Sequence, residues 1–249
     1  PGKNWTQWPD ELRNREPETL VKWREKITPE IRRQGIFQHE WLLMKDKANN
    51  LGIELIGDLP IFISHHSADV WANPELFQLD EEGLPTVVAG VPPDYFSETG
   101  QKWNTVLYNW AEHEQTNWRW WRERMARMLR LFDVVRIDHF RGFHSAWAVP
   151  REAADGIIGE WQDAPKERIV KVLVDVAGDE SRIIAEDLGI IPQDVIDLRL
   201  MFNLRGMAIL QFGFGDDWAD SPHHPSNINS MQIVYTGTHD NDTLLGWWE

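Results

Sequence analysis

The stretch DVVRIDHF, residues 133–140, decides the fold class that we predict. Its apolar residues form a continuous run rather than an alternating pattern, which is typical of a strand buried on both faces of a parallel sheet. Working outward, similar runs occur at residues 53–57, 182–186, 207–212 and 233–237, and helical segments separate them. Alternation of strands and helices predicts an α/β protein with a parallel sheet.

Two long helical segments have recognisable starts. Thr28 as a cap followed by Pro29 predicts a helix that ends near residue 50. Asn109 with Glu112 predicts a capping box that opens a helix reaching about residue 132. The apolar residues at helical spacing are Phe37, Trp41, Met44 and Ala48 in the first segment and Trp118, Trp121, Met125, Met128 and Phe132 in the second. Residues 80–83, DEEG, predict a hairpin turn between these segments.

The composition narrows the classes of function. The chain has 249 residues, 25 Lys and Arg against 40 Asp and Glu, and a formal net charge of −15. This balance disfavours binding to nucleic acid or to an anionic membrane surface, because phosphate binding relies on a surplus of basic side chains. The absence of cysteine excludes disulfides and thiolate metal sites. Fifteen tryptophans suit stacking on sugar rings, although core packing is the simpler explanation for most of them.

Acidic residues stand at or beside the ends of four expected strands. They are Asp58, Asp138, Glu186 and Asp240. In a parallel α/β barrel the ligand lies at the carboxyl ends of the strands, so these side chains are expected to converge on one mouth. An Asp after a strand also commonly caps the following helix. The prediction of a site therefore depends on the set and not on any single acid.

The neighbours of these acids suggest a division of roles. Arg136 stands two residues before Asp138, which places both side chains on one face of a strand, and we expect it to keep Asp138 ionised. Glu186 follows an apolar run, where burial and nearby acids would raise its pKa. Retaining glycoside chemistry needs one ionised and one protonated carboxyl group. Asp240 suits the role of a third acid, which would hold hydroxyl groups of the sugar.

Six blocks of this sequence resemble those of the 4-α-glucanotransferases of glycoside hydrolase family 77. The blocks are GDLPIF (57–62), SADVWANPELF (67–77), PTVVAGVPPDYFSETGQ (85–101), VVRIDHFRGF (134–143), IIAEDLG (183–189) and YTGTHDND (235–242). They follow the order of the family and extend over most of the chain. The family is related to the α-amylases, so the resemblance implies a (β/α)8 TIM barrel with loop insertions.

The resemblance also implies roles for individual residues. It implies that Asp138 is the nucleophile, Glu186 the general acid/base and Asp240 the stabiliser of the transition state. The residues implied to surround the sugar at the cleavage point are Asp58, Arg136, His139 and His239. The residues that match a loop folding over the glucan chain are Asp94, Tyr95, Phe96, Gln101 and Trp103. No metal or other cofactor is implied.

The organisation of the chain follows from the number of strands. About five β/α units are fewer than the eight of a closed barrel, so we expect a partial barrel belonging to a longer protein. Residues 1–249 would be the central part of the catalytic domain, with 1–50 a helical insertion or subdomain and 58–109 an active-site loop region. The resemblance implies maltooligosaccharides and other α-1,4-glucans as substrates, with no nucleic acid or membrane partner. It implies a cytoplasmic location, or a plastid one for a plant or algal source, and gives no oligomeric state.

Two rival functions remain open from the sequence. A hydrolase of the α-amylase type would use the same three carboxyl groups with water as the acceptor. The aromatic cover around Tyr95, Phe96 and Trp103 favours a glucan acceptor over water. A noncatalytic glucan-binding protein is the second rival, and the joint presence of Asp138, Glu186 and Asp240 argues against it.

Overall fold

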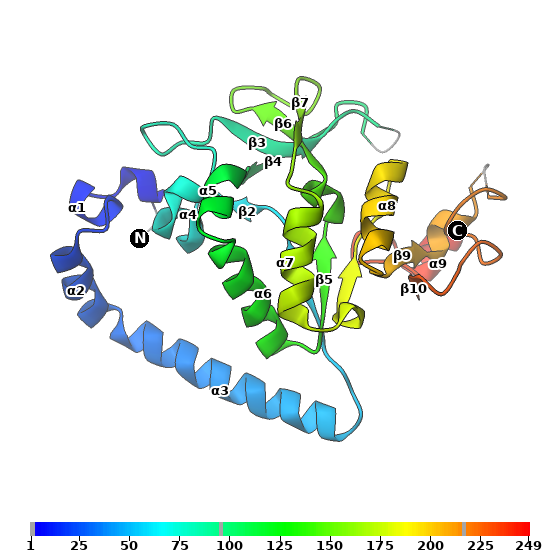
Figure 1. Cartoon of the computed structure of the whole chain (residues 1–249), viewed down its shortest axis with the longest axis horizontal. Helices are drawn as coiled ribbons and strands as arrows, with labels where there is room; N and C mark the ends of the chain where they lie inside the picture. The colour runs from blue at the N-terminus through cyan, green and yellow to red at the C-terminus, as the bar shows by residue number, and fades with distance from the viewer. Residues whose placement is uncertain (1–2, 95–96, 216–217) are drawn as a thin grey trace. The chain divides into compact units, whose positions relative to one another are not determined.

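The computed structural model describes residues 3–94, 97–215 and 218–249 of the chain (Figure 1). The chain forms two compact units, each assembled from segments that are separate in the sequence. Unit 1 consists of residues 1–55, 62–123 and 145–165, and unit 2 consists of residues 56–61, 124–144 and 166–249. Helix α6 (Arg119–Leu131) begins in unit 1 and ends in unit 2.

Unit 2 carries the parallel strands that the sequence predicts. β1, β5 and β8 form one parallel sheet, β9 and β10 form another, and a parallel bridge between Ile184 and Arg205 joins the two. The strands are β1 (Ile56–Pro60), β5 (Val134–Asp138), β8 (Ile183–Ala185), β9 (Gly206–Ile209) and β10 (Gln232–Tyr235). The first strand begins three residues later than expected, so Asp58 lies within β1 rather than after it. This arrangement is that of a partial (β/α)8 barrel.

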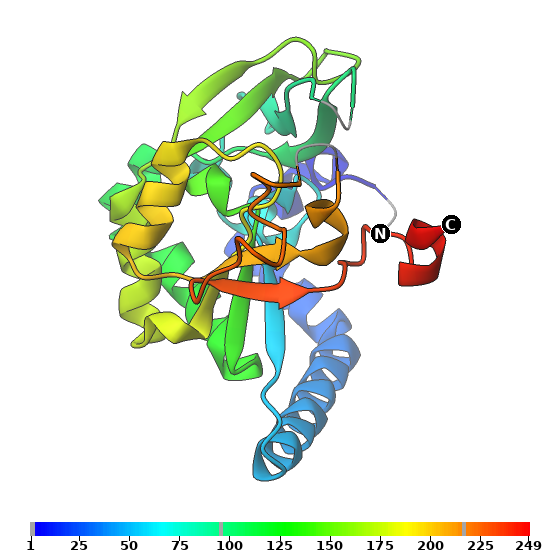
Figure 2. The same cartoon turned by 90° about the vertical axis from the view of Figure 1, so that its right-hand side faces the viewer.

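Helices cover one side of these strands. In Figure 2 α7 (Glu167–Ala177) and α8 (Gln193–Met201), coloured yellow-green and gold, lie together on the left of the parallel strands. Helix α7 buries Ile169 and Leu173 and ends at Gly178, whose φ of 71° is the left-handed conformation that glycine adopts at helix ends. The remaining helical elements of unit 2 are η3 (Phe140–Phe143), η4 (Glu180–Arg182), η5 (Leu210–Gly213) and α9 (Leu244–Trp248).

The two faces of β1 and β5 differ in burial, whereas the sequence predicts strands that are buried on both faces. In β1 and β5 buried residues alternate with more exposed ones, whereas β8 and β9 are buried throughout. Val135 and Ile137 are buried, while Arg136 and Asp138 occupy the other face of β5. The alternation arises because the second face of β1 and β5 carries charged side chains. That face is where the candidate site is built.

Unit 1 contains an antiparallel sheet with the strand order β2-β4-β3-β6-β7. Its strands are β2 (Ile63–Ser64), β3 (Val87–Val91), β4 (Gln101–Val106), β6 (Ser145–Pro150) and β7 (Glu160–Asp163). Residues 58–109 therefore include three strands of a sheet whose other two strands come from beyond residue 144. The predicted turn at residues 80–83 is confirmed by a bridge between Leu79 and Pro85.

The helices of unit 1 differ from the prediction at their ends. The first helix is present as α3 (Thr28–Asn50), but Ile27 is its N-cap and the Thr28 hydroxyl donates to the Arg24 carbonyl instead of capping. Asn109 is the N-cap of α5 without a side-chain hydrogen bond, so no capping box forms. A break at residues 116–118 also divides the second predicted helix. The other helical elements are η1 (Trp5–Gln7), α1 (Asp10–Arg13), α2 (Pro17–Lys26), α4 (Ala68–Ala72), η2 (Pro74–Leu76) and α5 (Trp110–Gln115).

Helix α3 has the expected apolar residues but buries none of them. Phe37 is 60% exposed and Met44 is 42% exposed. Within the described ranges, no helix is long and apolar enough to cross a membrane.

Candidate active site

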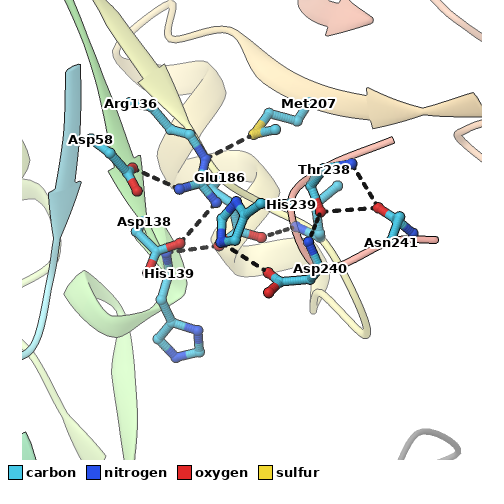
Figure 3. Close-up of polar contacts among 11 residues, drawn as sticks. Asp58, Arg136, Asp138, His139, Glu186, Met207, Thr238, His239, Asp240 and Asn241 are labelled. Atoms are coloured by element: carbon cyan, nitrogen blue, oxygen red, sulfur yellow. Dashed lines mark hydrogen bonds and ion pairs between the residues drawn. The ribbon is translucent and has the colours of Figure 1, made fainter. Parts of the chain in front are cut away.

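Arg136 is the centre of the charged cluster on unit 2, which Figure 3 shows. The parallel register places Asp58 of β1 beside Arg136 of β5. The Arg136 guanidinium lies 2.6 Å from the Asp58 carboxylate and 2.8 Å from the Asp138 carboxylate. Its Nε donates to the Met207 sulfur at 3.4 Å. Burial alone would lower the pKa of Arg136, but the hydrogen bond and charge of Asp58 and the charge of Asp138 raise it. Arg136 thus stays charged and fixes two carboxylates.

Glu186 follows β8 and occupies a different environment from Asp138. Burial, assisted by the negative charge of Asp138, raises the pKa of Glu186 to about 7. Two backbone N–H groups oppose this rise, because Leu188 donates to Oε1 at 2.9 Å and His139 donates to Oε2 at 2.7 Å. The expectation of a raised pKa is confirmed. Near neutral pH, Glu186 therefore exchanges a proton readily, which suits a general acid/base.

The donation from His139 depends on an unusual backbone conformation. His139 has φ of 55° and ψ of 52°, the left-handed region, immediately after β5. This turn directs its N–H at Glu186 and starts the short helix η3. Burial and the charge of Arg141 lower the pKa of the His139 imidazole to about 4, so the ring is neutral at pH 7. The structure thus brings the backbone N–H of His139 to the predicted site, whereas its imidazole points away from Glu186 and Arg136 (Figure 3).

The turn after β10 carries His239 and Asp240. The Asp240 carboxylate lies 3.4 Å from His239 Nε2, and its side chain is 81% exposed. Asn241 Oδ1 accepts hydrogen bonds from the backbone N–H and the hydroxyl of Thr238, and this hydroxyl accepts from the Asp240 N–H. No direct contact joins Asp240 to Asp138 or Glu186 within the described residues. Its predicted role in the transition state remains a prediction.

A cavity of about 250 Å³ lies next to this cluster. It is lined by Ile56, Gly57, Asp58, Arg136, Met207, Tyr235, Gly237, Thr238 and His239. Three of the predicted sugar-contact residues, Asp58, Arg136 and His239, therefore share one cavity. A larger cavity of about 630 Å³ lies in unit 1 beside Trp5 and Asp80. The larger cavity is lined by none of the predicted site residues, and neither cavity is lined by Asp138, Glu186 or Asp240. The charge arrangement therefore locates the candidate site better than cavity size does.

The predicted loop residues belong to unit 1. Asp94 Oδ1 accepts from the Ser97 N–H at 2.9 Å. Gln101 starts β4, and its Oε1 accepts from the Trp103 indole N–H at 2.9 Å. Tyr95 and Phe96 lie outside the described residues. Their roles over a glucan chain, like those of Asp94, Gln101 and Trp103, remain predictions.

Several contributors to the site have no signal in the sequence. The backbone N–H groups of His139 and Leu188 bind the Glu186 carboxyl whatever their side chains are. The Met207 sulfur reaches Arg136 only because β9 lies beside β8 in the row of parallel strands that also contains β5. No group of three or more His, Cys, Asp or Glu side chains in the described part of the chain is arranged to hold a metal ion.

The arrangement supports one type of chemistry in particular. Asp138 is paired with a permanently charged arginine, whereas Glu186 has a pKa of about 7. Two carboxyl groups in such different environments are what a nucleophile and a general acid/base in retaining glycoside chemistry require. The assignment of these two roles to Asp138 and Glu186 remains a prediction.

Comparisons with known proteins give a consistent family. A family model described as 4-alpha-glucanotransferase matches residues 1–249. A 4-alpha-glucanotransferase of rice (Oryza sativa subsp. japonica), named as chloroplastic/amyloplastic, is 47% identical over 99% of this chain and 42% of its own length. The 4-alpha-glucanotransferase of Thermus thermophilus is 47% identical over 99% of this chain and 50% of its own length. The chain thus spans half or less of the length of these relatives.

Solved structures agree with the fold. Amylomaltase from Streptococcus agalactiae in complex with acarbose has a TM-score of 0.92 and 37% identity, over 99% of this chain and 50% of that chain. Amylomaltase from Corynebacterium glutamicum has a TM-score of 0.72 and 21% identity, over 84% of this chain and 29% of that chain. The second likeness is one of fold alone.

Proposed function

The chain belongs to the 4-alpha-glucanotransferase family, and we propose that the protein containing it transfers a segment of an α-1,4-glucan to the 4-hydroxyl group of another glucan or of glucose. The observation that carries this proposal is the contrast between Asp138, paired with Arg136 at 2.8 Å, and Glu186, whose pKa burial raises to about 7. Maltooligosaccharides are the proposed substrates. The Streptococcus agalactiae relative, solved in complex with acarbose, supports a site for oligosaccharides of this kind.

The proposed mechanism is a double displacement. Asp138 attacks the anomeric carbon, the bond to the leaving glycosidic oxygen breaks, and Glu186 transfers its proton to that oxygen. The ionised Glu186 then removes the proton from the 4-hydroxyl of the acceptor, whose oxygen displaces Asp138 from the anomeric carbon. Each step inverts the configuration at this carbon, so the α-configuration is retained overall. Asp240 is proposed to hold sugar hydroxyls in the transition state, and the cycle needs no cofactor.

The remaining predicted residues receive proposed binding roles. Asp58, Arg136, His139 and His239 are proposed to surround the sugar at the cleavage point. The loop residues Asp94, Tyr95, Phe96, Gln101 and Trp103 are proposed to fold over the glucan chain. Residues 1–50 are proposed as a helical subdomain and residues 58–109 as an active-site loop region. We also propose a cytoplasmic location, or a plastid one if the source is a plant or an alga.

The function is tested by incubating the complete protein with maltotriose and separating the products. We expect glucose and longer maltooligosaccharides, because transfer conserves the number of glycosidic bonds. Accumulation of reducing ends would instead indicate the rival α-amylase-type hydrolase, and unchanged maltotriose would indicate a binding protein.

Asp138→Asn tests the assigned nucleophile. This variant should lose transfer, by on the order of 10⁴-fold or more, while binding of maltooligosaccharides stays measurable by calorimetry. The reason is that the amide keeps the shape of the side chain but cannot form the covalent intermediate. The matched control is Asp197→Asn, which removes an exposed acid from helix α8 and should leave transfer unchanged. Full activity of Asp138→Asn would refute the assignment.

A further inference from the structure

Asp187, which follows Glu186 directly, carries a buried carboxyl group. Only 11% of its side chain is exposed, and burial raises its pKa. A buried carboxylate is costly unless charged and hydrogen-bonding partners compensate for the lost water. These partners come from helix α8, from strand β9 and from the loop after it.

The partners of Asp187 form an anchored network. Arg199 Nε of α8 lies 2.9 Å from Asp187 Oδ2, and the Arg199 side chain is 8% exposed. This contact is an ion pair, since Arg199 Nε has no aligned hydrogen-bond acceptor among the described residues. Arg199 Nη1 donates to the carbonyl oxygens of Leu204 at 2.7 Å and Met231 at 3.2 Å. The charges of Arg199 and His223 both lower the pKa of Asp187, against the effect of burial.

Strand β9 also holds the Asp187 carboxylate directly. Asp187 Oδ1 accepts from the Met207 N–H at 2.8 Å. A Cβ atom added to Gly206 would lie 2.4 Å from Asp187 Oδ2, so only glycine admits the carboxylate at this point. One oxygen of Asp187 is thus held by the backbone of β9 and the other by the guanidinium of Arg199.

The anchoring of Asp187 bears on Glu186 through the peptide groups on either side of it. Glu186 Oε1 accepts from the N–H of Leu188, and Glu186 Oε2 accepts from the N–H of His139. Asp187 lies between Glu186 and Leu188, so a fixed Asp187 side chain also fixes the direction of the Leu188 N–H. We propose that the Asp187–Arg199 ion pair is a positioning device that orients the Glu186 carboxyl group for proton transfer. This inference rests on the proposed function, in which Glu186 is the general acid/base.

The perturbation that tests the proposal is Asp187→Asn in the complete protein. The amide keeps the size of the side chain but leaves the buried Arg199 without its counter-charge. A displacement of a catalytic group by about 1 Å costs on the order of a hundredfold in rate. We therefore expect kcat for maltotriose disproportionation to fall by about tenfold to a hundredfold, with KM changed by less than about threefold. Such a split indicates loss of an interaction made in the transition state.

A second donor separates positioning of Glu186 from general damage. Fluoride leaves α-maltotriosyl fluoride as an anion when Asp138 attacks the anomeric carbon, so this step needs no proton from Glu186. The burst of fluoride release in Asp187→Asn should stay within about threefold of wild type while the maltotriose rate falls. Equal losses with both donors would show a merely structural role and overturn the proposal. An unchanged maltotriose rate would also overturn it.

A double variant covers the case in which Asp187→Asn fails to fold. Asp187→Leu with Arg199→Met replaces the ion pair by apolar side chains of similar volume, which is often neutral for stability. The proposal requires this variant to combine a low maltotriose rate with a near-normal fluoride burst, and any other combination overturns it. Asp197→Asn on the same helix is the control for both variants. The proposed function fails separately if the wild-type protein itself does not convert maltotriose.

Discussion

Replacing Glu186 by Gln should remove a specific dependence of folding stability on pH. The pKa of Glu186 is about 7 in the folded protein against an ordinary value of 4.5, chiefly because of burial. The folded state therefore binds this proton more tightly than the unfolded chain does. The stabilising contribution is fully present below pH 4.5 and is lost as the pH rises through about 7. The whole effect amounts to about 3 kcal/mol, since one pKa unit corresponds to about 1.4 kcal/mol.

The assay is urea unfolding of wild type and Glu186→Gln in the complete protein at two pH values. Gln carries no charge at either pH, so its free energy of unfolding lacks this contribution. The difference in free energy of unfolding, variant minus wild type, should become more positive by about 2.5 kcal/mol between about pH 5 and about pH 8. The exposed-acid control Asp197→Asn should show a nearly constant difference. A constant difference for Glu186→Gln would refute the raised pKa and with it the reason for assigning Glu186 as the acid.

Four further predictions follow from the site. The value of kcat/KM for glucan transfer should fall as the pH rises through about 7, because bond cleavage needs protonated Glu186; a rate that is flat to about pH 9 would contradict this assignment. The carboxyl groups of Asp138 and Glu186 should lie about 5 to 5.5 Å apart in a crystal structure of the complete protein, and a separation of roughly 9 Å would instead indicate an inverting enzyme. Arg136→Lys should lower kcat by about tenfold to a hundredfold in a maltotriose assay, because a lysine cannot hold two carboxylates in the fixed geometry of a guanidinium. Gly206→Ala should destabilise the protein by about 1 to 3 kcal/mol in urea unfolding, since the new Cβ would overlap the Asp187 carboxylate. An unchanged unfolding midpoint would show that the segment carrying Asp187 moves away freely.

The sequence predicts the strands well because their signal is local. Continuous apolar runs separated by helical segments locate the parallel strands of the described residues to within a few residues. The Arg136–Asp138 spacing correctly predicts an ion pair. The prediction of where the helices begin and end is wrong where competing local interactions are close in free energy. Thr28 bonds backward along the chain instead of capping, and the helix after Asn109 breaks at residue 116.

The antiparallel sheet of unit 1 could not be predicted from patterns within single segments of the sequence. Strand β3 pairs with β6, and their partner residues Val87 and Pro150 are distant in sequence. Neither segment reveals its partner, because pairing is decided by which backbone groups meet after folding. A loop region inferred from its Pro, Gly and Asp content therefore contains strands of a sheet.

The sequence by itself determined the parallel α/β fold class, the resemblance to a family and the acids that were candidates for catalysis. Only the tertiary structure decided how these acids differ from one another. The contrast between Asp138 and Glu186 arises from a guanidinium on one side and burial with two backbone N–H donors on the other. The contacts of Asp187 with Arg199 and Met207 are likewise visible only in the tertiary structure. Burial and directed hydrogen bonds depend on groups brought together from distant segments, so no pattern within a single segment encodes them.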